Sequence, residues 1–175
     1  IASCLVGSEM CIRDSSFPGA QMPVIAAPGL RPFADLLVEV GAVQDVGLSP
    51  YGGRRLIPIV GGRAGGVHSG RAWSARVLAG GADHQRIVGA TLAELDARYV
   101  LETDAGELIY VANRAVRSAA PEVMQCLARG EPVNPDQVYF RCTPTFETAA
   151  PRWAWLSERL FVGNGVRLPL SLIHI

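Results

Sequence analysis

The sequence contains no lysine, and all 16 of its basic residues are arginine. Without lysine the chain cannot form a Schiff base, anchor pyridoxal phosphate or supply the lysine of a phosphate-binding P-loop. Runs of like charge are also missing, and the 16 basic residues balance 16 acidic residues. Because nucleic acids and anionic membranes attract basic patches, we expect neither as a partner.

Several motifs that carry chemistry are absent as well. There is no C-x-x-C pair, no G-x-S-x-G, no G-x-G-x-x-G after a strand, and no apolar run near the ~20 residues of a membrane helix. His68 and His84 have no matching pair of metal ligands, so we expect no metal and no cofactor. We interpret Cys126 and Cys142 as free thiols in a reducing compartment, which predicts a cytoplasmic protein.

Both ends of the sequence match translated sequencing adapter. Residues 170–175 read LSLIHI, which is the translation of a transposase end sequence used in sequencing libraries. Leu5–Ser15 read LVGSEMCIRDS, the translated reverse complement of that sequence with its adapter arm. We therefore interpret residues 1–15 and 170–175 as adapter-derived and exclude them from reasoning about the fold.

The remaining sequence divides into an arm and one domain. Residues 16–32 are rich in proline and glycine, which is typical of a linker or a loosely docked arm. Residues 33–169 are long enough for a single domain with a sizeable core. Short runs rich in β-branched and aromatic residues follow one another there, separated by glycine turns. We expect strands within Leu36–Val43, Arg54–Val60 (with Pro58 at an edge or bulge), Val67–Leu78, Ala82–Val88, Leu95–Val116, Gln137–Thr148 and Arg152–Gly163.

The clearest supersecondary unit is a hairpin over Leu95–Val116, turning at Asp104-Ala105-Gly106. If Ala105-Gly106 forms the turn, Arg98 lies opposite Asn113; the alternation leaves open which face is interior. One short helix is expected between Pro121 and Gly130, with Met124 and Leu127 buried. A series of strands without alternating helices predicts an all-β, antiparallel fold, and the many short turns favour a small closed barrel.

Five segments of the chain form a specific set when they are taken together. They are GGRRLIPIVGG (52–62), VLAGGADHQ (77–85), ELDARYVLETDAGELIYVANR (94–114), VYFRCTPTFET (138–148) and WAWLSERLFVGNGVR (153–167). In this order they resemble the uncharacterised bacterial and fungal family called domain of unknown function 3237. The resemblance covers about Phe33 to Arg167 and implies a lipocalin-like β-barrel, often a homodimer, without an established general activity. Some fungal relatives resemble ring-closing enzymes of aromatic polyketide pathways. His84 departs from the family, which usually has Trp after G-G-A-D.

Asp83 and His84 are candidate catalytic residues, because a carboxylate and an imidazole at a barrel mouth can shuttle a proton. The alternative is a turn with a self-bonding Asp and an exposed His. Arg98 and Arg141 lie among apolar neighbours and are candidates to hold an anionic or carbonyl group. Their alternative is a solvated outer face, or an ion pair with a strand carboxylate such as Glu102.

Four further residues are candidate ligand-binding groups. Of Arg54 and Arg55, at most one side chain faces the interior, and Arg55 is the candidate. Gln85 follows Asp83 and His84. Asn113, opposite Arg98 in the predicted hairpin, would complete a polar spot with it; the alternative is that Asn113 only satisfies buried donors. Trp155 shares one face of the predicted last strand with Trp153; core or dimer packing is the main alternative to lining a pocket.

Two functions from different classes follow. The first is a binding module, a barrel holding one small apolar or aromatic molecule in its mouth, without catalysis. The second is a cofactor-free cyclase or isomerase acting on aromatic or polyketide-like substrates by acid–base chemistry. A structural homodimer without ligand is the third reading, so the sequence leaves open whether the protein is an enzyme.

Overall fold

The structure is a computed structural model that describes residues 26–168 and 172–174. The chain divides into two units, residues 1–31 and 32–175. In the first unit, the described residues 26–31 are exposed and have no helix or strand. The predicted adapter segment at residues 1–15 and most of the predicted arm at residues 16–32 lie outside the described residues.

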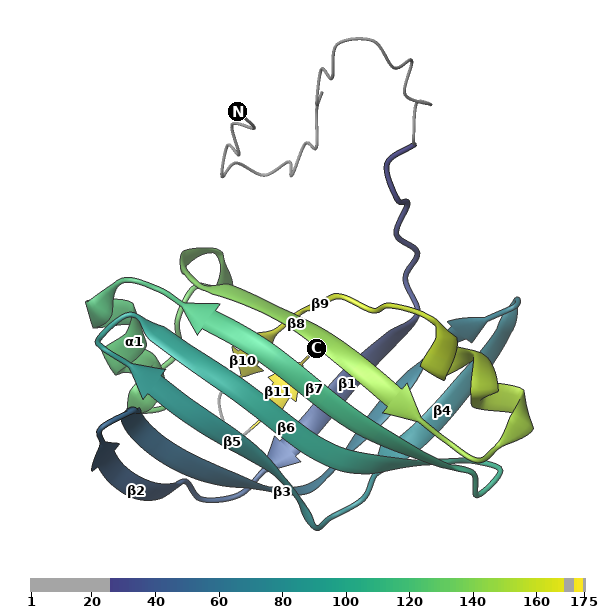
Figure 1. The fold of residues 1–175 in the computed structure, drawn as a ribbon, viewed down its shortest axis with the longest axis horizontal. Helices are drawn as coiled ribbons and strands as arrows, with labels where there is room; N and C mark the ends of the chain where they lie inside the picture. Colours follow the sequence, from purple (N-terminus) through teal and green to yellow (C-terminus); the bar gives the residue numbers. More distant parts are fainter. Residues whose placement is uncertain (1–25, 169–171, 175) are drawn as a thin grey trace, which may run out of the picture. The chain divides into compact units, whose positions relative to one another are not determined.

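The second unit is mostly β-structure, and Figure 1 shows its strands wrapping around a common interior. None of its helices is long and apolar enough to cross a membrane in the described part of the chain. The helices are α1 (Pro121–Ala128), η1 (Pro135–Gln137) and η2 (Pro151–Glu158). The strands are β1 (Ala34–Val40), β2 (Gln44–Ser49), β3 (Gly52–His68), β4 (Arg71–Val77), β5 (Gly81–Val88), β6 (Leu92–Thr103), β7 (Leu108–Ser118), β8 (Tyr139–Glu147), β9 (Gly163–Asn164), β10 (Val166–Leu168) and β11 (Leu172–His174).

All strand pairs are antiparallel, and the sheet closes on itself. The long strand β3 pairs with β1 and β2 along one side and with β4 and β5 along the other. From there the order continues through β6, β7, β8 and β9. Gly165 separates β9 from β10, and β10 returns through β11 to β1. The expectation of a small closed antiparallel barrel is confirmed.

The closing strand β11 lies within the segment that we interpret as adapter-derived. Leu172–His174 pairs with β1 on one side and with β10 on the other. The origin of this segment stays a prediction, but its backbone completes the sheet in this chain. The neighbouring residues 169–171 and 175 lie outside the described residues.

A bulge in β3 decides which of its side chains enter the barrel. Ile57 and Ile59 are buried before the bulge, and Ala64 is buried after it, so the inward positions change from odd to even numbers. The register with β1 shifts at this point. Gly62 has a φ of +134°, and a Cβ there would lie 2.1 Å from the carbonyl oxygen of Leu37. Glycine is therefore required where the strand bends.

The hairpin of β6 and β7 has the predicted location but a different register. Arg98 lies opposite Ala112, and Asn113 lies opposite Ala97, so the predicted pairing of Arg98 with Asn113 is wrong. The turn has three residues between Thr103 and Glu107, and Gly106 has a φ of +77°. A three-residue turn that ends in a left-handed glycine shifts the pairing by one residue relative to a two-residue turn.

Two other predicted elements need correction. Val67–Leu78, predicted as one bent strand, contains the turn between β3 and β4 at Ser69 and Gly70. Arg152–Gly163, predicted as the last strand, is mainly the helix η2. Pro151 starts this helix, and the buried Trp153 and Leu156 are three residues apart, which is the repeat of a 3₁₀ helix. Helix α1 is confirmed, with Leu127 buried and Met124 partly buried.

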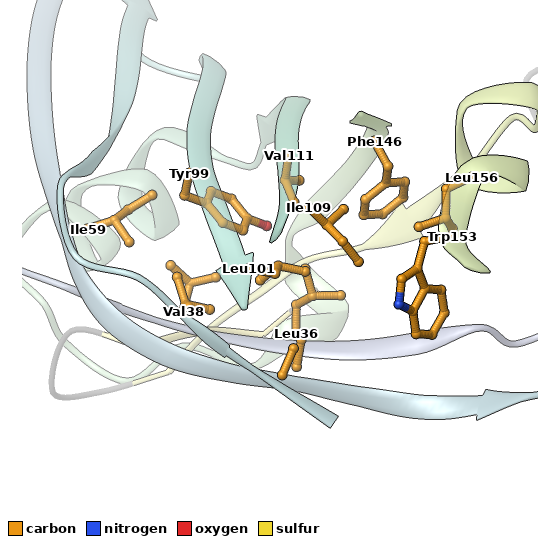
Figure 2. Close-up of a cluster of buried hydrophobic side chains, with 13 residues drawn as sticks. Leu36, Val38, Ile59, Tyr99, Leu101, Ile109, Val111, Phe146, Trp153 and Leu156 are labelled. Atoms are coloured by element: carbon orange, nitrogen blue, oxygen red, sulfur yellow. The ribbon is translucent and has the colours of Figure 1, made fainter. Parts of the chain in front are cut away.

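The main hydrophobic core fills one part of the barrel (Figure 2). Its members come from most strands of the barrel and from η2, whose Trp153 is only 1% exposed. A smaller apolar cluster of Ala93, Leu95 and Phe140 packs with Met124 of α1. In Figure 1, α1 and the yellow-green helix η2 lie at opposite ends of the barrel. The labelled core members in Figure 2 are Leu36, Val38, Ile59, Tyr99, Leu101, Ile109, Val111, Phe146, Trp153 and Leu156.

We predict that Leu101→Ala lowers the free energy of unfolding by about 2–5 kcal/mol, because Leu101 is 1% exposed in the main core and truncation leaves a cavity. Leu108→Ala, at a position that is 54% exposed, is the matched control and should change stability by no more than about 0.5 kcal/mol. Urea unfolding of both variants measures the difference. Equal effects of the two substitutions would contradict this assignment of the core.

Candidate functional site

Polar side chains interrupt the apolar interior beside the smaller hydrophobic cluster. We call Asp83, Gln85, Asn113 and Arg117 the polar cluster; each is at most 4% exposed. All four side chains lie on the inward faces of β5 and β7. Residues that pair across neighbouring strands form rows around the barrel wall, and three successive rows contain the polar cluster. These rows contain Gly53, Ile87, Ala93, Arg117 and Phe140; then Arg55, Gln85, Leu95, Ala115 and Cys142; then Ile57, Asp83, Ala97, Asn113 and Pro144.

Asp83 is the acidic member of the polar cluster. Its Oδ2 accepts a hydrogen bond of 2.6 Å from Nε2 of Gln85, whereas its buried Oδ1 has no partner among the described residues. Burial raises the pKa of Asp83, and the Gln85 hydrogen bond and the charge of Arg117 oppose this shift only in part. A carboxyl group with these properties is suited to hold or move a proton.

Two neutral polar side chains nearby each have a buried oxygen without a partner among the described residues. The side-chain oxygen of Asn113 is buried and has no hydrogen-bond partner among the described residues, although the Asn113 side chain hydrogen-bonds Cys142. The hydroxyl of Tyr99, which lies two residues from Ala97 on β6, is equally buried and unpartnered. Burial raises the pKa of Tyr99, so this hydroxyl stays protonated and available as a donor. Buried polar atoms are normally satisfied, so several orphans in one interior need an explanation.

Arg117 is the most unusual member of the polar cluster. It is 4% exposed, and its Nε has no partner in the described part of the chain. Its guanidinium carbon lies 5.9 Å from the centre of the Phe140 ring. Burial and the nearby Arg167 lower the pKa of Arg117 to about 10, which still leaves the group charged at neutral pH. A buried charge of this kind is costly unless a partner compensates it.

A small pocket opens beside Arg117, under the segment that contains α1 and η1. Its volume is about 20 Å³, which is room for about one water molecule. Arg117 and Arg167 contribute its charged lining, and the remaining wall is mostly apolar. The apolar lining consists of Leu127, Val133, Pro135, Val138, Phe140, Gly165 and Val166.

The structure brings four of the candidate residues predicted from sequence to the barrel interior. Asp83, Gln85 and Asn113 belong to the polar cluster. Arg55 lies in the same row as Gln85, and its side chain is 31% exposed with an ion pair of 3.2 Å to Asp45. Their role in binding remains a proposal, and the predicted polar spot of Asn113 with Arg98 does not form, because Arg98 lies on the outer face.

Three other candidates are on the outer face, so their expected position in a pocket is wrong. His84 and Arg98 are exposed, and Arg98 pairs with Asp96 at 3.1 Å. Arg141 is also exposed, and its guanidinium lies over the ring of Tyr139 at 4.9 Å. Strand alternation explains the error: His84 is adjacent to the inward Asp83, and Arg141 to the inward Cys142. The change from Trp to His84 relative to the family therefore lies outside the barrel.

Trp155, the remaining candidate, is partly buried and belongs to an aromatic group near η2. Its ring stacks on His68 with centroids 4.3 Å apart and packs edge-on against Phe33 at 5.3 Å. The indole nitrogens of Trp155 and Trp73 are the other buried polar atoms without a partner among the described residues. These indoles are neutral donors inside an aromatic group, so core packing accounts for Trp155.

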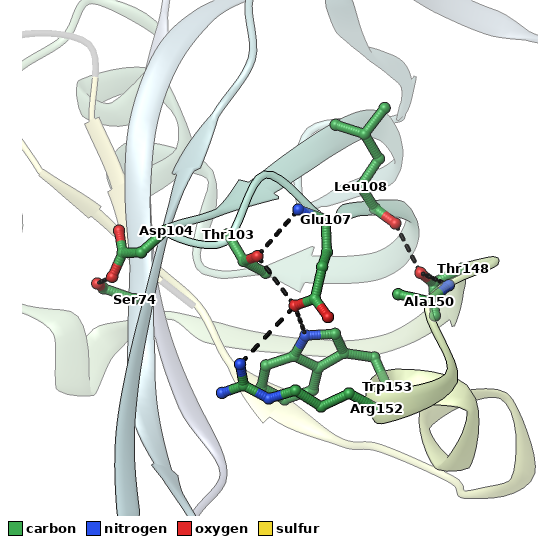
Figure 3. Close-up of polar contacts among 9 residues, drawn as sticks. All are labelled: Ser74, Thr103, Asp104, Glu107, Leu108, Thr148, Ala150, Arg152 and Trp153. Atoms are coloured by element: carbon green, nitrogen blue, oxygen red, sulfur yellow. Dashed lines mark hydrogen bonds and ion pairs between the residues drawn. The ribbon is translucent and has the colours of Figure 1, made fainter.

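Polar contacts fix η2 to the barrel, as Figure 3 shows. Nε1 of Trp153 donates a hydrogen bond of 2.6 Å to Oε2 of Glu107, and Thr103 donates to the same oxygen at 3.1 Å. Arg152 is 3.9 Å from this carboxylate. Thr148 donates to the carbonyl oxygen of Leu108 at 2.6 Å. These bonds satisfy the indole nitrogen of Trp153 and the hydroxyls of Thr103 and Thr148.

Sequence reasoning missed Arg117, Arg167 and Tyr99. A signal for Arg117 was present, because Asn113 and Arg117 are four residues apart on one strand and so share a face. Placing Asn113 in the interior therefore places Arg117 there too. Arg167 follows the break at Gly165, and no pattern in the sequence connects it with β7.

The fold and the site define a small closed β-barrel protein with a buried polar cluster and an arginine-lined pocket. Comparisons with known proteins agree with the β-barrel fold. A model of a protein family of unknown function, DUF3237, matches residues 28–174. The chain belongs to this family, as its sequence motifs predicted.

The relatives are bacterial. A UPF0311 protein of Rhodopseudomonas palustris is 42% identical over 132 residues, which cover 75% of this chain and 84% of the relative. A crystal structure of a conserved protein of unknown function from R. palustris has a TM-score of 0.73 and 38% identity, covering 81% of this chain and 90% of that one. A β-barrel-like protein from Acinetobacter baumannii has a TM-score of 0.72 and 37% identity, covering 87% and 96%.

We predict that Asp83→Asn changes the pH dependence of stability. Because burial raises the folded pKa of Asp83 above its unfolded value, its contribution is fully favourable below the unfolded pKa and is lost as the pH rises through the folded pKa. The free energy of unfolding of Asp83→Asn minus that of the original chain should therefore increase from about pH 4 upward, by about 1.4 kcal/mol per unit of pKa difference.

Asp96→Asn is the matched control for this experiment. The hydrogen bond from Arg98 lowers the pKa of Asp96, so its contribution is present above the unfolded pKa and is lost on acidification. The two variants should therefore show opposite pH trends in urea unfolding measured across the same range. A stability difference for Asp83→Asn that stays constant with pH would show that burial does not control this carboxyl group.

Proposed function

We propose that the barrel binds one small molecule in its interior, in the manner of a lipocalin-like carrier, with the polar cluster as the binding site. The observation that carries this proposal is a group of buried polar atoms that have no partner in the described part of the chain. Leaving a buried donor or acceptor unsatisfied costs about 1–3 kcal/mol each. A purely structural barrel gains stability by filling these positions with apolar side chains, whereas a binding site needs them. The atoms are Asp83 Oδ1, Tyr99 OH, Asn113 Oδ1 and Arg117 Nε.

The surroundings of the polar cluster favour a ligand with an apolar or aromatic body. Leu95, Ala97 and Ala115 occupy inward positions between the polar residues, and Phe140 lies beside Arg117. Binding sites for small molecules combine such apolar walls with a few fixed donors and acceptors. Here the acceptors are oxygens of Asp83 and Asn113, and the donors are Tyr99 and Arg117.

A cofactor-free cyclase or isomerase is the second candidate, and one observation favours it. Asp83 is a buried carboxyl with a raised pKa and a hydrogen bond that orients it through Gln85. A general base needs such a tuned pKa within reach of its substrate. His84 has no part in this enzyme mechanism, because it lies on the outer face.

Asp83→Asn should abolish turnover and preserve binding if the protein is an enzyme.

We predict that Asn113→Leu separates stability from binding. The substitution replaces an unsatisfied buried amide oxygen with apolar surface, so the free energy of unfolding should stay equal or rise, by up to about 2 kcal/mol. Ligand affinity should fall at least about tenfold, since the ligand loses a polar partner. Arg114→Leu, on the exposed outer face of the same strand, should leave affinity unchanged.

Native mass spectrometry of the chain, incubated with a mixed library of aromatic acids, phenols and polyketide-like lactones, measures retention. A retained mass that weakens in Asn113→Leu but persists in Arg114→Leu supports the proposal, and a retained mass with altered composition favours the enzyme. If the original chain retains nothing, or if Asn113→Leu retains the ligand unchanged, the proposal is wrong. The same spectra report whether the chain is the expected homodimer.

A further inference from the structure

We propose that the ligand carries a carboxylate, which the guanidinium groups of Arg117 and Arg167 bind in the pocket under α1. This inference rests on the proposed function and names the chemical class of its ligand. It begins from the two arginines that line the pocket. They come from β7 and β10, on parts of the chain that the folded sheet brings together.

The positive charge at this pocket has no counter-ion among the residues that the structure describes. Neither Arg117 nor Arg167 has an ion pair or a side-chain hydrogen bond within the described ranges, and both are largely shielded from solvent. The arginines that face this region also repel one another. The charges of Arg167 and Arg55 lower the pKa of Arg117, and the charge of Arg55 lowers the pKa of Arg167. A folded chain that places like charges together in this way is arranged for an anion from outside.

Neither Asp45 nor Asp83 acts as the counter-ion of Arg117 and Arg167. Asp45 pairs with Arg55 at 3.2 Å and is itself largely exposed. Asp83 accepts a hydrogen bond from Gln85 instead of forming an ion pair with Arg117, and its own pKa is raised by burial. The attraction between Asp83 and Arg117 affects Arg117 less than burial and the repulsion from Arg167 do. A net positive charge therefore remains at the pocket.

The shape and lining of the pocket select a carboxylate attached to an apolar body. A volume of about 20 Å³ suits a head group that replaces a water molecule and is too small for a whole ligand. Guanidinium groups present N–H donors in a planar fork that matches the two oxygens of a carboxylate. Leu127, Val138 and Phe140 offer apolar contacts to the atoms that follow the head group.

Isothermal titration calorimetry with naphthoate, its neutral isostere naphthamide and inorganic phosphate tests this inference. The original chain should bind naphthoate at least about tenfold more tightly than naphthamide, because only the carboxylate compensates the guanidinium charges. Arg117→Met should weaken naphthoate at least about 30-fold and leave naphthamide within about threefold. Arg167→Met should weaken naphthoate in the same direction. Arg114→Met, on the outer face of β7, should change neither affinity.

The possible outcomes separate the two proposals. Arg117→Met removes a buried charge, so its unfolding midpoint should equal or exceed that of the original chain; if it fails to fold, Arg167→Met alone decides. Equal binding of naphthoate and naphthamide, phosphate binding without naphthoate binding, or affinities unaffected by both arginine variants would overturn the carboxylate. If naphthoate does not bind but a library compound does so in an Asn113-dependent way, the carboxylate class is wrong and the proposed function stands.

Discussion

Arg117 places a charged group where a closed barrel offers it little water. Its side chain is 4% exposed, points inward near the C-terminal end of β7 and packs beside Phe140. An arginine keeps its charge under physiological conditions, so burial must be compensated by hydrogen bonds and opposite charge. Among the residues that the structure describes, none supplies a hydrogen bond at Nε of this residue. The same interior contains Asp83, Gln85 and Asn113. We interpret their arrangement as part of the site that would compensate this unsatisfied cation.

The barrel separates its main hydrophobic core from the proposed binding site along its length. The main core includes Trp153 and Leu156 of η2, and the hydrogen bonds at Glu107 fix that helix in place (Figures 2 and 3). At the other end, α1 contributes Leu127 to a pocket and belongs to a much smaller apolar cluster. A large core at one end can support unsatisfied polar groups toward the other, which is how a scaffold maintains a binding site that reduces its own stability.

Much of the architecture could be predicted from the sequence, whereas the interior face could not. Glycine and proline positions located α1 between Pro121 and Gly130 and the hairpin around Gly106. Successive side chains of a strand alternate between its two faces, but this alternation does not show which face points into the barrel. It therefore did not distinguish Arg98, which is exposed, from Arg117, which is buried. The run after Pro151 contains aromatic residues typical of a strand, but packing of Trp153 against the barrel made it helical. Arg117 of β7 and Arg167 of β10 line one pocket only because the sheet closes, so local sequence patterns did not bring them together.

The central claim is that the polar interior is completed by a ligand. A crystal structure of the chain, grown with an aromatic carboxylate and refined at high resolution, tests this claim most directly. We expect a carboxylate bound to the guanidinium groups of Arg117 and Arg167, with the body of the molecule toward Asn113 and Tyr99. An interior in which Arg117 forms an ion pair with Asp83 and every buried polar atom has a protein partner, without a bound molecule, would contradict it.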